Sequence, residues 1–181
     1  MSEKKLAKFK EALIHFGASD LNESILKEID LKELLLMSTE ETEPRLCFRS
    51  AWALEHILLK NPKLLEAVYK ELVNNYKELN NYSSLRSYTK LIMWILSKEN
   101  KNISLNTSEL ESILEKTFQI VELPDCPVAV RVNGFDILYR LIPYFDWVKN
   151  ELKLLIEFNL EKESTAAMKS RGITLLNKLN K

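Results

Sequence analysis

Residues 130–141, VRVNGFDILYRL, have a near copy at 168–179, MKSRGITLLNKL, and this pair decides the fold. In each stretch a cation follows the opening apolar residue, and a glycine comes three positions after that cation. The copies agree in glycine, leucine, cation and leucine at four matched positions: Gly134 with Gly172, Leu138 with Leu176, Arg140 with Lys178, and Leu141 with Leu179. Self-similarity at a spacing of 38 residues is typical of repeated helix pairs.

Two earlier segments extend the repeat. Four helices open on an apolar residue and then a cation: Arg49, Arg86, Arg131 and Lys169 are those cations. The intervening helices, beginning their apolar stripes at Leu65, Leu110 and Val148, are offset by 45 and then 38 residues. The offsets from Arg86 to Arg131 and from Arg131 to Lys169 are also 45 and 38. Two helix sets with matching spacing indicate a chain of helix-pair repeats.

Composition independently excludes most other fold classes. The chain has 181 residues but only three glycines and five prolines, too few for the turns and bulges of a β-sandwich or barrel. No glycine-rich phosphate loop is possible, so Rossmann and Walker-type sites are excluded. The 26 basic and 26 acidic residues cancel, which does not favour a nucleic-acid or membrane-surface partner. We therefore expect an all-α protein.

Capping and helix-breaking residues in the sequence predict about nine helices. Gly17 is expected as a left-handed residue after the first helix, and Thr42 as an N-cap with Pro44 in the first turn. Ser108 and Glu111 have the spacing of a capping box. Other caps are expected at Ser83 or Ser84 and at Asp125 or Cys126. The expected ranges are 3–16, 20–37, 44–60, 62–79, 84–98, 108–123, 127–142, 146–160 and 165–181.

The pattern that opens at Val130 and Arg131 resembles that of HEAT-like repeats, in the armadillo-type superfamily. The resemblance covers residues 44–181 and implies a right-handed α-solenoid of antiparallel helix pairs. We expect one domain over residues 1–181. Its parts would be N-terminal capping helices (1–43), three helix-pair repeats (44–81, 82–125, 126–163) and a C-terminal half-repeat (164–181). At the matched Gly134 and Gly172 we expect close helix–helix contacts.

Solenoids of this kind bind partners on the concave face, which the second helix of each pair lines. The side chains opposite the apolar stripes are the predicted partner-binding residues: Lys70, Asn74, Glu115, Gln119, Lys153 and Glu157. Their charges alternate in sign along the repeats, which suits a protein or peptide better than a phosphodiester backbone. We therefore expect a non-enzymatic protein-interaction module with no cofactor.

Two enzymatic alternatives follow from the resemblance. Some HEAT-like solenoids are DNA glycosylases that use Trp and Asp at a damaged base, and Asp146 with Trp147, or Asp136 beside Phe135, could take that role. Zero net charge weighs against this alternative. Others are lyases that act on tetrapyrrole pigments, and the repeat is the only feature of this sequence that supports that alternative.

The remaining chemically interesting residues have structural interpretations. We expect the repeated cations to pair with carbonyls or carboxylates of neighbouring units, and Trp52, Trp94 and Trp147 to lie in the core. His56 is expected to be a partly buried, satisfied residue, and Cys47 and Cys126 to be free thiols. Two distant histidines predict neither a catalytic triad nor a zinc site. Without a leader or a long apolar run, the expected location is cytoplasmic.

Overall fold

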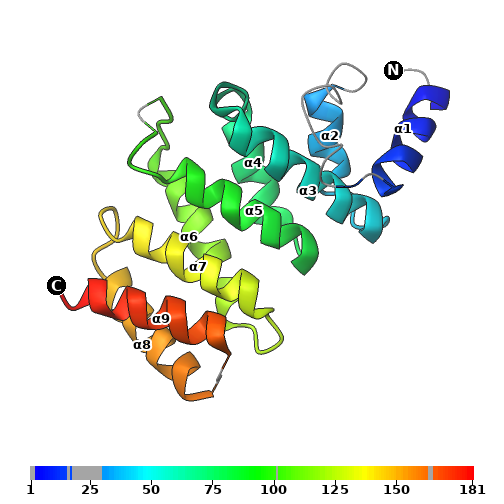
Figure 1. Ribbon diagram of the computed structural model, residues 1–181. Helices are drawn as coiled ribbons and strands as arrows, with labels where there is room; N and C mark the ends of the chain where they lie inside the picture. Colours follow the sequence, from blue (N-terminus) through cyan, green and yellow to red (C-terminus); the bar gives the residue numbers. More distant parts are fainter. Residues whose placement is uncertain (1–2, 16, 18–29, 101, 163–164) are drawn as a thin grey trace. The chain divides into compact units, whose positions relative to one another are not determined.

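The computed structural model describes residues 3–15, 17, 30–100, 102–162 and 165–181. Within these ranges the chain forms nine helices and no strand, which confirms the all-α prediction (Figure 1). The helices are α1 (Glu3–His15), α2 (Leu31–Met37), α3 (Pro44–Lys60), α4 (Pro62–Glu78), α5 (Tyr82–Ile95), α6 (Thr107–Glu122), α7 (Val128–Leu141), α8 (Val148–Lys162) and α9 (Ala166–Leu179). None of them combines the length and apolar composition needed to cross a bilayer.

Several helix starts differ from their predicted caps. Glu43, and not Thr42, is the N-cap of α3, and the Thr42 hydroxyl donates instead to the Glu40 carboxylate. Before α5, the Asn81 side chain accepts from the Ser84 amide, 3.1 Å away. Thr42 thus bonds a carboxylate in place of the helix amide that the sequence pattern assigned to it, and Asn81 makes the bond to a helix amide that the pattern assigned to Ser83 or Ser84. Pro44 and Pro62 do lie in the first turns of α3 and α4, as predicted.

The capping box of α6 lies two residues earlier than predicted. Asn106 accepts from the Glu109 amide at 2.9 Å, and the Glu109 carboxylate accepts from the Asn106 amide at 2.8 Å. Ser108 and Glu111 are therefore already inside the helix. Pro127, not Asp125 or Cys126, is the N-cap residue of α7. An Asn with Glu at the right spacing satisfies the free amides as well as Ser does.

One prediction for the N-terminal region needs correction. The helix ending at Met37 begins only at Leu31, because Asp30 has extended backbone and caps it by accepting from the Lys32 amide at 2.9 Å. The predicted start of that helix at Asp20 lies outside the described residues. The left-handed conformation expected at Gly17 depends on residue 16, which lies outside the described residues, so it stays a prediction.

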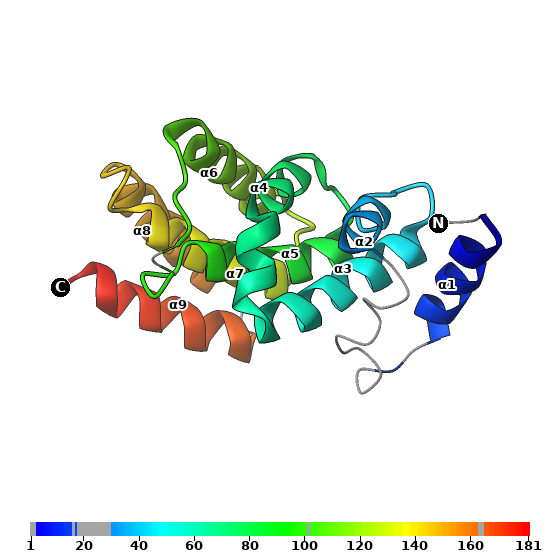
Figure 2. The same cartoon turned by 90° about the horizontal axis from the view of Figure 1, so that it is seen from above.

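The chain divides into two compact units, residues 1–91 and 92–181, and the division falls within α5. In unit 1, α3 packs against α1, α2 and α4. In unit 2, α7 packs against α6, α8 and α9, and Figure 2 shows α6 and α8 on one side with α7 and α9 on the other. Unit 2 therefore has two helical layers with an apolar core between them.

The matched glycines of unit 2 lie at helix crossings, as predicted. A Cβ atom added to Gly134 on α7 would lie well inside 3.0 Å of Cγ1 of Val121, on α6. One added to Gly172 on α9 would come within 3.2 Å of side-chain carbons of Ile156 and Leu160, on α8. Glycine thus lets the helix backbones approach closely at equivalent points of two successive helix pairs.

Candidate functional site

The predicted partner-binding residues lie on three helices. Lys70 and Asn74 are on α4 in unit 1, Glu115 and Gln119 are on α6, and Lys153 and Glu157 are on α8. All are exposed except Lys153, which is half-buried. On each helix the two residues are four positions apart and share a face.

The repeated cations have the expected kind of partner at two positions. Nε of Arg49 donates to the carbonyl of Leu13 at 3.0 Å. The buried Arg131 donates from one guanidinium nitrogen to the carbonyls of Leu123 and Pro124, at 2.9 and 3.2 Å. Both arginines thereby tie a helix start to the end of an earlier segment. The other two cations, Arg86 and Lys169, are exposed.

His56 and the cysteines have no catalytic arrangement around them in the described chain. Nδ1 of His56 lies 3.0 Å from the Trp52 carbonyl, and the imidazole meets the Trp52 ring edge-on at a centroid distance of 4.9 Å. This half-buried, bonded histidine matches its prediction. Cys47 and Cys126 are both buried thiols that form no disulfide, also as predicted. In the described ranges no three His, Cys, Asp or Glu side chains gather closely enough to hold a metal ion.

A buried polar network joins four helices of unit 1. The Ser38 hydroxyl donates to the Leu35 carbonyl at 2.7 Å, so the Tyr88 hydroxyl donates the 2.6 Å bond to Ser38 Oγ. The Asn75 amide donates to Tyr88 Oη at 3.0 Å and to the Leu35 carbonyl at 3.2 Å. The Cys47 thiol donates to the Ser38 carbonyl at 3.0 Å. Every group in this network has a partner, so it holds the helices in register.

The same burial makes the network chemically quiet. Loss of solvent raises the pKa of the Cys47 thiol, an effect only partly opposed by its 3.2 Å contact with Ser84 Oγ. Burial raises the pKa of Tyr88 to about 12, although its bonds to Ser38 and Asn75 act in the opposite direction. Both groups are therefore protonated at neutral pH, and a protonated, enclosed thiol is a poor nucleophile.

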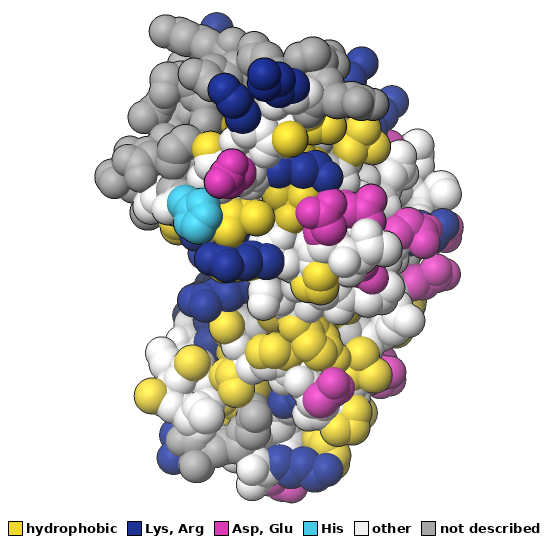
Figure 3. All heavy atoms as spheres, turned by 90° about the vertical axis from the view of Figure 1, so that its right-hand side faces the viewer, with side chains coloured by type: hydrophobic (Ala, Val, Ile, Leu, Met, Phe, Trp, Pro, Cys, Tyr) yellow, Lys and Arg dark blue, Asp and Glu magenta, His cyan; other side chains and the backbone are white. Residues whose placement is uncertain are grey.

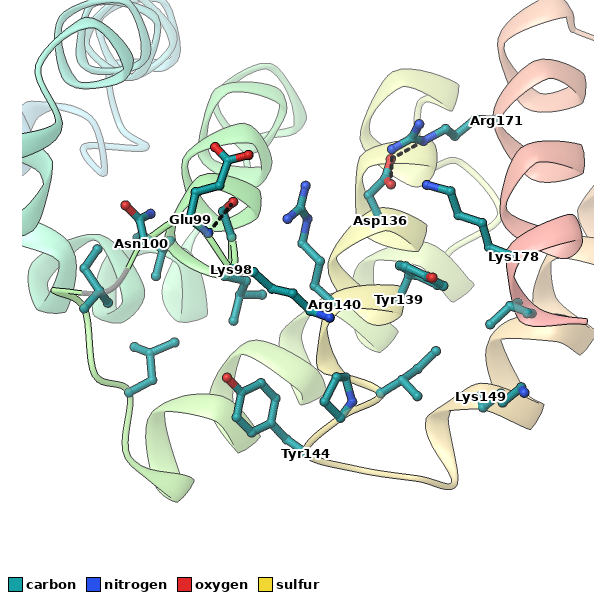
Figure 4. A pocket seen from close by; sticks show the side chains of 18 residues that line it. Lys98, Glu99, Asn100, Asp136, Tyr139, Arg140, Tyr144, Lys149, Arg171 and Lys178 are labelled. Carbon is teal, nitrogen blue, oxygen red and sulfur yellow. Dashed lines mark hydrogen bonds and ion pairs between the residues drawn. The ribbon is translucent and has the colours of Figure 1, made fainter. Parts of the chain in front are cut away.

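Unit 2 contains an open cavity of about 800 Å³ (Figure 4). Its wall is built from three segments: the end of α5 with the loop after it, the C-terminal half of α7 with the turn that follows, and α9. Lys149, near the start of α8, completes the lining. Apolar side chains such as Ile95, Ile103 and Ile142 form part of the wall, between the charged groups.

Positive charge dominates this cavity. Five cationic side chains and two carboxylates line it: Lys98, Arg140, Lys149, Arg171 and Lys178 against Glu99 and Asp136. Arg171 forms a two-pronged ion pair with Asp136, whose side chain is 8% exposed. Lys178 lies over the Tyr139 ring, 5.6 Å from its centroid. Within the described residues, Lys98, Arg140 and Lys149 form no ion pair, so the cavity presents unneutralised charge.

None of the six predicted partner-binding residues lines this cavity. The residues that do line it come from segments far apart in the sequence, and cations near helix C-termini are ordinary complements to the helix dipole. One signal for the cavity was present, because Arg140 and Lys178 occupy the same repeat position and both lie in the lining. The repeat thus brings both cations into the lining of one cavity, whereas the sequence alone shows only that they occupy the same repeat position.

A second exposed feature is an apolar stripe on α8. Trp147 is 54% exposed, so the prediction that it lies in the core is wrong, whereas Trp52 and Trp94 are half-buried. Trp147 lies in the turn before α8, and its ring stacks on Phe118 of α6 with the centroids 5.6 Å apart. Leu154 and Phe158 continue the stripe and are 60% and 52% exposed.

The residues considered for a glycosylase are spread over different environments. Asp146 is exposed beside Trp147, Phe135 is completely buried, and Asp136 is occupied by Arg171. The geometry thus offers a basic cavity and an apolar helix face as binding surfaces of unit 2. No protein family, curated protein or solved structure was found to match the chain.

Proposed function

We propose that this chain is a helical-repeat module that binds a partner protein on the exposed face of α8 and catalyses no reaction of its own. The observation that carries the proposal is the apolar stripe of Trp147, Leu154 and Phe158. Leu154 and Phe158 are four residues apart and share one face of α8, and Trp147 lies in the turn at the N-terminal end of that helix. Single exposed apolar residues are ordinary, but a line of three large ones marks an interaction surface.

The surroundings of the stripe favour a partner with an amphipathic helix. Stacking on Phe118 holds the Trp147 ring in place before binding, which lowers the entropic cost of using it as an anchor. Lys153 and Glu157 flank the stripe with opposite charges. On the face of the molecule drawn in Figure 3, acidic, basic and hydrophobic side chains are all exposed. Mixed charge around apolar anchors suits a helix with apolar residues at i, i+3, i+4 and i+7.

The proposal extends to architecture and location. The two units would be parts of one right-handed HEAT-like α-solenoid domain, with residues 1–43 as capping helices, and the protein would act in the cytoplasm. The equivalent glycine contacts at Gly134 and Gly172 support the repeat register on which this arrangement depends. Lys70, Asn74, Glu115 and Gln119 would supply further polar contacts on their own helix faces.

Site-specific photocrosslinking tests the proposal. A photoreactive phenylalanine analogue is placed at Leu154 in the full chain and, as a control, at the exposed Thr174 on α9. In an extract of the native source, position 154 should crosslink one discrete protein, and mass spectrometry of the adduct should map to an amphipathic helix of that protein.

Matched substitutions make the result specific. Phe158→Glu should abolish the crosslink, whereas Ile173→Glu, at an apolar residue of α9 that is 51% exposed, should leave it unchanged. The proposal is wrong if position 154 crosslinks nothing, gives the same adducts as position 174, or crosslinks only a second copy of the chain.

A further inference from the structure

The strongest electrostatic feature of the molecule is the cavity of unit 2. The chain as a whole has no net charge, yet the side chains lining this cavity carry an excess of three positive charges. Gathering like charges around one space raises their mutual repulsion, and an anion in that space would lower it. The cavity is therefore built at an electrostatic cost that a ligand of opposite charge would remove.

We propose that this cavity binds a small organic phosphate: a molecule with two or more negative charges and one flat aromatic part. Its phosphate oxygens would bond Arg140 and Lys98. A guanidinium can hold two phosphate oxygens at once, and a lysine ammonium adds a point charge beside it. Figure 4 shows Lys98 extending from the loop after α5 toward the middle of the cavity, where Arg140 also stands.

The two cations are held on fixed backbone. Arg140 lies in the last turn of α7. Lys98 lies in a turn fixed by the Ser97 amide, which donates to the Trp94 carbonyl at 2.9 Å, and by the Asn100 side chain, which donates to the same carbonyl at 2.6 Å. Binding would therefore order side chains and leave the backbone as it is, which keeps its entropic cost low.

The aromatic part of the ligand has one suitable partner. The face of Tyr139 is already covered by Lys178. Tyr144, in the turn after α7, lines the mouth of the cavity and is 60% exposed, so one ring face is open to a stacked ligand. Two backbone bonds from Tyr144 and Phe145 to the Leu141 carbonyl, at 2.9 and 3.1 Å, fix this turn.

Size favours a small molecule over a macromolecule. A volume of about 800 Å³ lies within the range of roughly 300 to 1,000 Å³ that is usual for small-molecule sites. A nucleic-acid duplex or a long acidic peptide would need cations spread over an open surface. Here they line one open cavity of limited volume, with apolar side chains between them. A nucleoside diphosphate has both the charge and the flat ring that these residues can use.

Calorimetric titration of the full chain at low salt tests the proposal, with ADP, inorganic pyrophosphate and adenosine as probes. ADP should bind, pyrophosphate should bind more weakly, and adenosine should show no binding, because charge provides most of the affinity and stacking provides the rest. An acidic hexapeptide and a short DNA duplex serve as competing classes. The proposal is overturned if either binds more tightly than ADP, or if ADP shows no heat at about 1 mM.

Substitutions locate the site. Arg140→Gln and Lys98→Gln should each weaken ADP binding about tenfold or more. Tyr144→Ala should weaken ADP binding but leave pyrophosphate binding unchanged, a split that nonspecific charge attraction cannot produce. Lys169→Gln removes the same charge from an exposed position of α9 outside the cavity and should have no effect. An equal loss in Lys169→Gln would place the binding elsewhere and overturn the assignment. Photocrosslinking from α8 is unaffected by either result.

Discussion

Unit 1 and unit 2 contain polar groups in opposite states. In unit 1, the buried Tyr88 hydroxyl bonds both Ser38 and Asn75, and each of these donors has an acceptor. In unit 2, Lys98 and Arg140 face an open cavity without a carboxylate partner among the described residues. The first arrangement stabilises a fold, because unmade bonds inside it would be costly. The second arrangement stabilises little and leaves cationic groups that the proposed ligand would use.

This contrast also explains why the chemically reactive residue types are poor guides to function here. Cys47 and Tyr88 would attract attention in a search for nucleophiles, yet burial raises the pKa of both. The cavity is lined by cations, carboxylates, tyrosines and apolar groups together with Ser97 and Asn100, and its lining includes no cysteine or histidine. What distinguishes it is the local excess of charge. Each prediction below tests one side of the contrast, beginning with the largest expected change.

Replacing Gly134 by leucine should destabilise the protein most. Even a Cβ atom at this position would overlap Val121, which is short, branched and 2% exposed and therefore has nowhere to move. We expect a loss of more than about 3 kcal/mol in the free energy of unfolding, measured by urea denaturation. Gly172→Ala is the matched control, because its 3.2 Å contacts can relax and alanine favours a helix, so its effect should stay below about 1 kcal/mol. Equal effects of the two would contradict the crossing geometry.

High pH should expose the contribution of Tyr88. Its pKa is raised to about 12 in the folded protein, from about 10 in the unfolded chain, so this contribution is complete below pH 10. Between pH 10 and pH 12 the unfolded state ionises first, and roughly 2–3 kcal/mol should be lost. The Tyr88→Phe variant has no hydroxyl to ionise at this position, so it does not lose this part of the stability. The variant should be less stable at pH 8 yet overtake the wild type near pH 12, and melting curves that stay parallel would refute this account.

Breaking the ion pair of the cavity wall should cost less. Arg171→Leu leaves the buried Asp136 carboxylate without its two-pronged partner, for an expected loss of about 2 kcal/mol. Adding Asp136→Asn to that variant should recover part of the loss, since a neutral amide is cheaper to bury than a charge. Chemical denaturation of the single and double variants measures both steps. A double variant that is less stable than Arg171→Leu alone would mean that Asp136 has another role.

Arg140→Gln should change stability least, by less than about 0.5 kcal/mol, and at low salt the change should be a small gain because repulsion within the cavity falls. Added salt should erase that gain. Thermal melting at two ionic strengths is sufficient to measure it. A loss comparable to that of Arg171→Leu would show that Arg140 is a structural residue after all, and would remove the contrast between the units.

Helical periodicity and prolines predicted the fold class and most helix ends from sequence. Pro44 and Pro62 mark helix starts because the missing amide is harmless there. The repeat register even located the crossing at Gly134, since only a repeated constraint explains a glycine at matched positions. The caps were less predictable. Thr42 and Asn106 are both residue types that can cap a helix. Which of several neighbouring polar residues becomes the cap depends on the backbone amide that its side chain reaches.

The cavity could not be predicted because it depends on tertiary placement. Lys98, Arg140 and Lys178 are separated by up to 80 positions, and each alone looks like a solvated cation near a helix end. The prediction for Trp147 failed for a different reason. An aromatic residue near a helix start is usually buried, but this one is 54% exposed although its ring stacks on Phe118. Charge and hydrophobicity are visible in the sequence, whereas the space they surround is not.

The polar network of unit 1 also sets an order of events during synthesis. Ser38 precedes its partner Tyr88 by 50 residues, which a ribosome adds in roughly 3–10 s. Throughout that interval α2 and α3 can be complete, while Ser38 and Cys47 still lack the groups that later enclose them. The N-terminal helices therefore leave the ribosome as an assembly that cannot close, and the arrival of α5 completes it.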